Sequence, residues 1–163
     1  MGERGEKLAA RFEQAVADFA AAVEACPDDV WRSVRGPEGW TVAAAAQHVS
    51  GQFPLEMEYV TAWAEGRPSP AYTWADVNGK NDARAAKNTN ATKADVLNEL
   101  RTSAADIARY IRGLSDAQLD RKQGLPLADG AEVTTEQVLL SGILIDHLDA
   151  HRKATVEASG TPA

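Results

Sequence analysis

The residues of this sequence with the clearest capacity for chemistry are its three histidines. His147 and His151 are four residues apart in the segment LLSGILIDHLDAHRKA, which has the apolar pattern of a helix. Residues i and i+4 of an α-helix lie on one face, one turn apart, so both rings should point the same way, in line with Leu140 and Leu144. Two such imidazoles can bind one divalent ion at about 2.0–2.1 Å if another helix supplies a third ligand.

His48 is the remaining histidine and therefore the candidate third ligand. Its neighbours at helical spacing, Ala44, Gln52 and Leu55, form a stripe that is expected to face inward. Small residues around it in the run AAAAQHVSG would let a neighbouring helix approach closely. All three histidines are thus predicted to lie on the interior stripes of long helices.

The same pattern also has a purely structural interpretation. Histidines in a helical core are often hydrogen-bonded core residues, and each buried ring would then need a polar partner to offset its desolvation. Few partners are evident near these stripes, although Gln52 could serve one ring. From the residues alone, a metal triad and a set of core histidines both remain open. The single cysteine, Cys26, is interpreted as a small buried hydrophobe rather than a nucleophile.

Four long segments with helical periodicity must position these side chains. The expected helices span residues 6–25, 42–65, 93–112 and 135–158, the last with Thr134 as its N-cap. Pro54 predicts a kink or a short break in the second helix. We expect an all-α four-helix bundle with one long crossover, which carries a short extra helix from Asp82 to Lys87. The segment 122–133 is expected to be a connection with a little extended structure, and residues 1–163 are predicted to form one domain.

Composition narrows the class of function. The chain has 163 residues and a net charge of −7, which argues against a nucleic-acid-binding surface because such a surface needs clustered Lys and Arg. The N-terminal stretch MGERGEKLAARFEQ lacks the apolar core of a secretory signal, and no apolar run approaches the roughly 20 residues that span a bilayer. We therefore expect a cytoplasmic protein with no nucleic-acid or membrane partner.

Four segments resemble the DinB-like superfamily, which includes the N-terminal domains of mycothiol-dependent maleylpyruvate isomerases. They are GWTVAAAAQHVSGQ, NGKNDARAAKN, TKADVLNELR and ILIDHLDAHRKA, and the resemblance covers nearly the whole chain. It implies an up-down-down-up four-helix bundle that holds a divalent metal, often zinc or nickel, with His48, His147 and His151 as ligands. In the isomerase branch a Glu often occupies the place of His147, so close kinship with that isomerase is not implied. Asn81 matches a recurring family Asn of unassigned role.

The resemblance also implies an activity. It favours a metal-dependent enzyme that uses a low-molecular-weight thiol of the mycothiol or bacillithiol type in S-transfer or detoxification, or a related hydrolase. It further implies a small-molecule substrate and a homodimer. A non-catalytic metal- or small-molecule-binding module related to stress is the alternative, and a structural bundle is the third possibility.

Further side chains could support the histidines. By helical spacing, the candidates to hold the second ring nitrogens are Gln47, Gln52, Glu56 and Asp146. Asp146 adjoins His147 in sequence and so faces another direction, which favours a solvated role. Four aromatic residues could line a pocket or simply pack in the core: Trp40, Trp74, Tyr59 and Tyr72.

Overall fold

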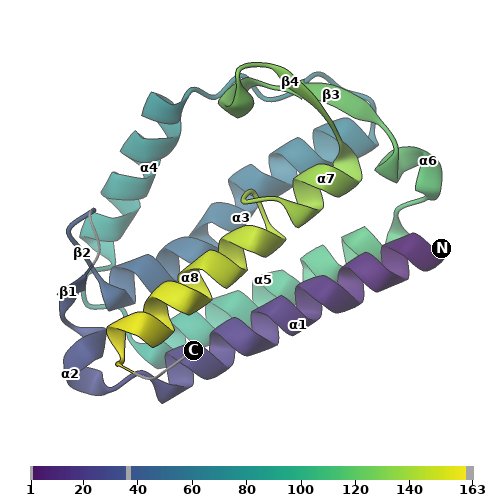
Figure 1. The fold of residues 1–163 in the computed structure, drawn as a ribbon. Helices are drawn as coiled ribbons and strands as arrows, with labels where there is room; N and C mark the ends of the chain where they lie inside the picture. The colour runs from purple at the N-terminus through teal and green to yellow at the C-terminus, as the bar shows by residue number, and fades with distance from the viewer. Residues whose placement is uncertain (1, 36–37, 161–163) are drawn as a thin grey trace.

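Four long helices lie lengthwise beside one another in the computed structural model, which describes residues 2–35 and 38–160 (Figure 1). These helices are α1 (Glu3–Ala25), α3 (Val42–Ala64), α5 (Lys93–Gly113) and α8 (Ile145–Ala158). α1 and α8 run in one direction and α3 and α5 in the other, which is the up-down-down-up order. The predicted all-α four-helix bundle is confirmed.

The crossover helix α4 (Trp74–Lys87) is longer than the sequence analysis predicted. Because α3 and α5 are parallel, the chain must return along the bundle between them, and α4 makes part of this return (Figure 1). The expectation of a short helix from Asp82 was wrong. Thr73 accepts a hydrogen bond from the backbone N–H of Asp76, and the Asp76 carboxylate accepts one from the Thr73 N–H. This capping box starts the helix two turns earlier than expected.

The remaining elements are short and lie at the ends of the bundle. They are α2 (Asp28–Trp31), β1 (Val34–Arg35), β2 (Trp40–Thr41), α6 (Asp116–Leu119), β3 (Lys122–Leu125), η1 (Pro126–Ala128), β4 (Ala131–Thr134) and α7 (Thr135–Leu140). β1 pairs with β2 and β3 with β4, both antiparallel. The second pair lies in the segment 122–133, where a little extended structure was expected.

The predicted fourth helix is in fact two helices, α7 and α8, and this corrects the expectation of one continuous segment. Ser141 interrupts the helical ladder because its hydroxyl donates to the carbonyl of Val138 and accepts from the N–H of Ile143. Gly142 follows directly, and Gly/Ser pairs are frequent sites of helix breaks. Leu140 therefore ends α7 and does not lie on the helix that carries His147 and His151.

Helix α3 runs through Pro54 without interruption, so the break that Pro54 suggested does not occur. Pro54 itself is exposed, whereas its neighbours Phe53 and Glu56 are buried against the rest of the bundle. Burial of this face maintains the helix despite the hydrogen bond that proline cannot donate.

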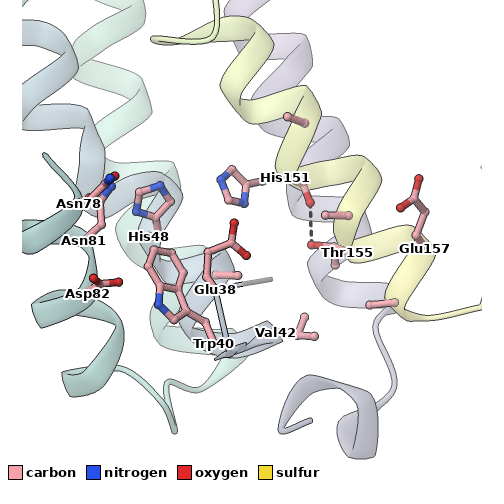
Figure 2. Close-up of a pocket in the computed structure, with 14 residues that line it drawn as sticks. Glu38, Trp40, Val42, His48, Asn78, Asn81, Asp82, His151, Thr155 and Glu157 are labelled. Atoms are coloured by element: carbon pink, nitrogen blue, oxygen red, sulfur yellow. Dashed lines mark hydrogen bonds between the residues drawn. The ribbon is translucent and has the colours of Figure 1, made fainter. Parts of the chain in front are cut away.

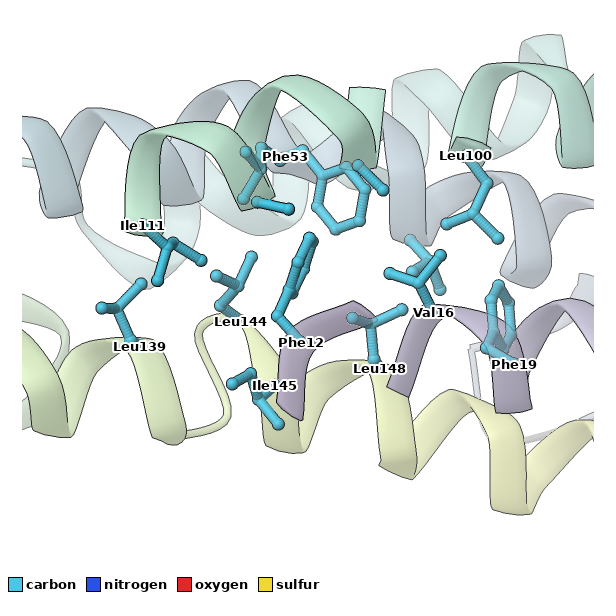
Figure 3. Packing of buried hydrophobic residues seen from close by; sticks show 14 of the residues in the cluster. Phe12, Val16, Phe19, Phe53, Leu100, Ile111, Leu139, Leu144, Ile145 and Leu148 are labelled. Atoms are coloured by element: carbon cyan, nitrogen blue, oxygen red, sulfur yellow. The ribbon is translucent and has the colours of Figure 1, made fainter. Parts of the chain in front are cut away.

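The core lies along the axis of the bundle. Phe12 of α1 and Phe53 of α3 meet edge to face with ring centroids 5.9 Å apart. Figure 3 shows Leu144 and Leu148 approaching these rings from α8. Full burial of each such side chain contributes about 1.5–3 kcal/mol. Cys26 is also buried, as predicted. Within the described residues, no helix has the length and apolar character needed to cross a bilayer.

Candidate metal centre

The three histidines converge between α3 and α8. His48 comes from α3, and His147 and His151 come from successive turns of α8. One ligand atom from each ring lies within 4.8 Å of the others. His48 is buried, and the other two rings are partly buried. The structure thus brings together the three residues that the sequence analysis selected.

The spacing of the ring nitrogens fits a divalent ion. Nε2 of His48 lies 3.2 Å from Nε2 of His147. Ligands about 2.0–2.1 Å from a tetrahedral ion lie roughly 3.4 Å from one another. The two rings would therefore need to move very little to bind one ion. Nδ1 of His48 is buried without a hydrogen-bond partner among the described residues. A cluster of polar rings in this position is costly unless it binds something.

Glu56 lies directly against His147. Its Oε1 lies 2.7 Å from Nδ1 of His147, and the carboxyl group is only 3% exposed. Glu56 is two turns beyond His48 on α3, so one helix carries both a candidate ligand and the group that positions a second. Contact at Nδ1 leaves Nε2 of His147 free to face the centre, as in carboxylate–histidine–metal arrangements.

Burial keeps the imidazoles neutral. It lowers the pKa of His48 to about 3, with further lowering by His147, His151 and Arg84. It lowers the pKa of His147 to about 4. The pKa of His151 also falls to about 4, through burial and His147, against an opposing effect of Glu38. Neutral imidazole is the form that binds metals, so protons compete weakly here.

Burial also raises the pKa of Glu56 well above its ordinary value, against an opposing effect of Arg84. Arg84 is half-buried on α4 and donates to Oε1 of Gln52. Gly51 makes room for it, because a Cβ at Gly51 would lie 2.6 Å from Cδ of Arg84. The guanidinium thus reaches α3 at the turn between His48 and Glu56.

The other proposed supporting residues have different partners. Gln47 donates to Glu99, and Gln52 accepts from Arg84. Asp146 lies on the surface 3.8 Å from Arg11, which agrees with its expected solvated role. Of the four candidates, Glu56 alone contacts a histidine of the cluster within the described part of the chain.

A pocket of about 1060 Å³ opens beside the histidines. Figure 2 shows His48 and His151 facing it from α3 and α8, with Trp40 directly below His48. The Trp40 ring lies 5.4 Å from the His48 ring between centroids. Asn81, singled out by the resemblance, also lines the pocket, and its Oδ1 is buried without a partner among the described residues.

Three of the four candidate aromatics do not reach this pocket. Trp74 is exposed and donates from its ring N–H to the carbonyl of Leu127. Tyr59 is buried in the core, and Tyr72 donates to Glu58. They therefore serve packing and local hydrogen bonding.

The sequence analysis named Asn81 but missed the rest of the polar wall of the pocket. Asn78, Asn81 and Asp82 line it from α4 at helical spacings of three and four residues. This stripe was hidden because α4 was expected to begin only at Asp82. Glu38 and Glu157 also line the pocket and were not predicted. No motif near either residue in the sequence indicates a role in a site.

Fold and site together define a helical bundle with a candidate three-histidine metal centre. The family model of the DinB superfamily (DinB_2) matches residues 11–154. The chain therefore belongs to the DinB superfamily. No curated protein sequence matches it.

Solved structures share the fold at low identity. YfiT from Bacillus subtilis is described as a probable metal-dependent hydrolase with an unusual four-helix bundle topology. It is 20% identical with a TM-score of 0.75, and the match covers 99% of this chain and 91% of YfiT. A mycothiol-dependent maleylpyruvate isomerase is 14% identical with a TM-score of 0.70, covering 98% of this chain but 62% of the isomerase. At such identities the comparison establishes the fold alone.

Proposed function

We propose that this chain is a divalent-metal-dependent enzyme that uses a low-molecular-weight thiol to attack an electrophilic small molecule. The observation that carries this proposal is the convergence of His48, His147 and His151 within 4.8 Å beside a pocket. Three neutral imidazoles suit zinc or nickel and leave at least one coordination position for an external ligand, as in catalytic rather than structural sites. A metal bound there supplies Lewis acidity, which lowers the pKa of a thiol or of water.

The chain's own residues hold and shape this centre. Glu56 fixes the ring of His147 through Nδ1, and helix α3 fixes Glu56 relative to His48. Trp40 packs against the His48 ring and covers one side of the pocket. These contacts hold the three rings in a preset arrangement, which limits the reorganisation needed on binding.

We propose that the nucleophile comes from outside the chain. Among the described residues, those that line the pocket include no Cys, Ser or Lys, and the hydroxyl of Thr155 donates to the carbonyl of His151. The pocket volume of about 1060 Å³ slightly exceeds the usual range for ligand pockets, roughly 300–1,000 Å³. It therefore has room for a thiol cosubstrate and an electrophile together, which favours thiol transfer over attack by water.

In the proposed reaction the thiol loses its S–H proton to solvent. The sulfur forms a bond to the electrophilic carbon as the bond from that carbon to its leaving group breaks. With a chlorinated aromatic as the probe, chloride departs with the electron pair of the carbon–chlorine bond. No redox partner is required.

A metal-dependent hydrolase is the second candidate. The described function of YfiT and its coverage of 91% by this chain favour it. Water would then replace the thiol as nucleophile, and a single substrate would occupy the pocket. A binding module without turnover is the third candidate, with the same ligand set.

One experiment separates these candidates. Protein purified without a histidine tag is loaded with zinc or nickel and incubated with 1-chloro-2,4-dinitrobenzene and, in turn, mycothiol, bacillithiol and glutathione. Parallel reactions contain p-nitrophenyl acetate without thiol. We expect thiol-dependent product formation that His147→Ala abolishes. Thiol-independent ester cleavage that is lost in the same variant would instead support the hydrolase, and no turnover in either assay would support the binding module.

The small-molecule substrate, the homodimer and the cytoplasmic location remain predictions from the resemblance and the composition. Sedimentation velocity of the purified protein tests the homodimer directly. A monomer at micromolar concentration would contradict it.

A further inference from the structure

The ionised side chains that line the pocket beside the histidines all carry the same sign of charge. Glu38, Asp82 and Glu157 line it, and no Lys or Arg does so among the described residues. None of these carboxylates forms an ion pair within the described part of the chain, although carboxylates elsewhere on the surface pair repeatedly with Arg and Lys. A ligand that enters this pocket therefore meets three uncompensated carboxylates.

An aromatic ring lies among these carboxylates. Figure 2 shows Trp40 between the Asp82 carboxylate and the Glu38 carboxylate, with His48 above it. Trp40 is partly exposed, so its surface is accessible from the pocket. An indole face attracts cations through its quadrupole, and carboxylates beside it add to this attraction.

Two further polar groups at this pocket lack partners. His48 is 5% exposed and lines the pocket, and its Nδ1 has no hydrogen-bond partner among the described residues. Oδ1 of Asn81 is an unused acceptor in the same wall. The Asn81 acceptor is matched by an N–H donor on a ligand.

We propose that the organic ligand of this pocket carries a positively charged nitrogen, which binds against Trp40 and the carboxylates of Glu38 and Asp82 while the rest of the ligand extends toward the histidines. This assignment rests on the proposed function, because it names the substrate class of the same site. It predicts that, of two electrophilic substrates of equal size, the pocket prefers one that carries an ammonium or guanidinium group over an anionic one.

The carboxylates could instead only balance the charge of a bound ion. The two interpretations differ in what a cation does in the metal-loaded protein. If the carboxylates are fully used by the ion, a second cation gains nothing from them. If they serve the ligand, a cation binds in preference to a neutral molecule of similar shape.

The test is calorimetric titration of the metal-loaded protein with three probes: benzyltrimethylammonium, benzyl alcohol and benzenesulfonate. The quaternary ammonium has no lone pair, so it cannot coordinate the metal and reports only on the pocket wall. We expect it to bind about tenfold more tightly than benzyl alcohol, and benzenesulfonate to bind most weakly. Added salt should weaken the binding of the cation.

Two variants and a matched control locate the effect. Glu38→Gln and Asp82→Asn should each weaken binding of the cation about three- to fivefold, because each removes one exposed carboxylate. Asp116→Asn makes the same change of net charge on α6, at the opposite end of the bundle from Trp40, and should leave the affinity unchanged (Figure 1). Circular dichroism confirms folding, which these exposed substitutions should not disturb.

Equal affinity for the three probes, no detectable binding of the cation, or equal effects of Asp82→Asn and Asp116→Asn would overturn the proposal. Its failure is distinct from failure of the metal assignment. A protein that retains metal but shows no preference for the cation disproves only the charge selection. A protein that binds the cation but no metal disproves the proposed function and leaves the charge selection standing.

Discussion

Oε1 of Glu56 lies 2.7 Å from Nδ1 of His147, and both groups are largely removed from solvent. A fully buried carboxyl is costly unless it serves a partner. The contact links the two helices that supply the histidines, so Glu56 acts as a positioning residue for the cluster. Its effect should be visible in metal affinity rather than in the fold.

Glu56→Gln is the substitution that tests this role. It preserves shape but replaces an acceptor-only carboxylate with an amide, which should lower metal affinity about 10- to 100-fold while helicity stays unchanged. Competition with a chromophoric chelator measures the affinity. Gln47→Met is the control, because the Gln47 side chain donates to Glu99 and not to a histidine. Equal losses in both variants would contradict a specific role for Glu56.

Removal of metal should lower thermal stability. A ligand that binds only the native state, present at 100 times its dissociation constant, stabilises by about 2.7 kcal/mol, which corresponds to roughly 5–10 °C in Tm for a chain of this size. Chelation followed by readdition of zinc or nickel should reverse the change in wild-type protein. His48→Ala should show no shift on readdition, and a persistent shift would exclude His48 as a ligand.

The metal-free protein should become less stable as the pH falls below the ordinary pKa of histidine. The folded pKa values of about 3 for His48 and about 4 for His147 and His151 lie below the ordinary value of 6.5. The unfolded chain therefore binds more protons between these limits, and stability declines as pH decreases through this window. The raised pKa of Glu56 has the opposite effect on stability, because this carboxyl favours the folded state at lower pH. We expect the combined effect of the three imidazoles to be larger than that of the one carboxyl.

Thermal melts of chelated protein across this pH range measure the dependence. His151→Gln removes one of the titrating rings and should flatten the slope. A Tm that rises on acidification would show that the rings are charged in the folded protein.

The N-cap of α4 offers a separate test of how the pocket wall is held. Thr73→Ala removes the acceptor for the Asp76 N–H, which should cost about 0.5–2 kcal/mol. Because α4 carries Asn78, Asn81 and Asp82, the substitution should also weaken binding of benzyltrimethylammonium without loss of metal. Thr102→Ala, at an exposed position inside α5, is the control. A variant with unchanged stability would indicate that tertiary packing alone holds α4.

The histidine cluster could be predicted in part from local sequence, and the resemblance to the DinB-like superfamily supplied the rest. The spacing of His147 and His151 places them on one helical face, and His48 was the only ring left to join them. The bundle followed from the periodicity of the long helices, whose apolar stripes must be buried against one another.

What could not be predicted depended on interactions that spacing does not reveal. The break at Ser141 arises when a side chain replaces backbone hydrogen bonds, and the same Ser–Gly pair could have stayed helical. The early start of α4 depended on a capping box with Asp76, in a segment whose Asn and Gly residues lower helix propensity. The acidic wall required knowing how α4, the turn before β2 and α8 meet in space, which no single segment contains.

The central claim is that His48, His147 and His151 bind one divalent ion. Crystals of protein purified without a histidine tag and loaded with zinc should be measured on both sides of the zinc absorption edge. We predict a single anomalous peak bounded by the three imidazoles, with a stoichiometry of about one ion per chain. The absence of a peak, or a peak away from His48, would contradict this account.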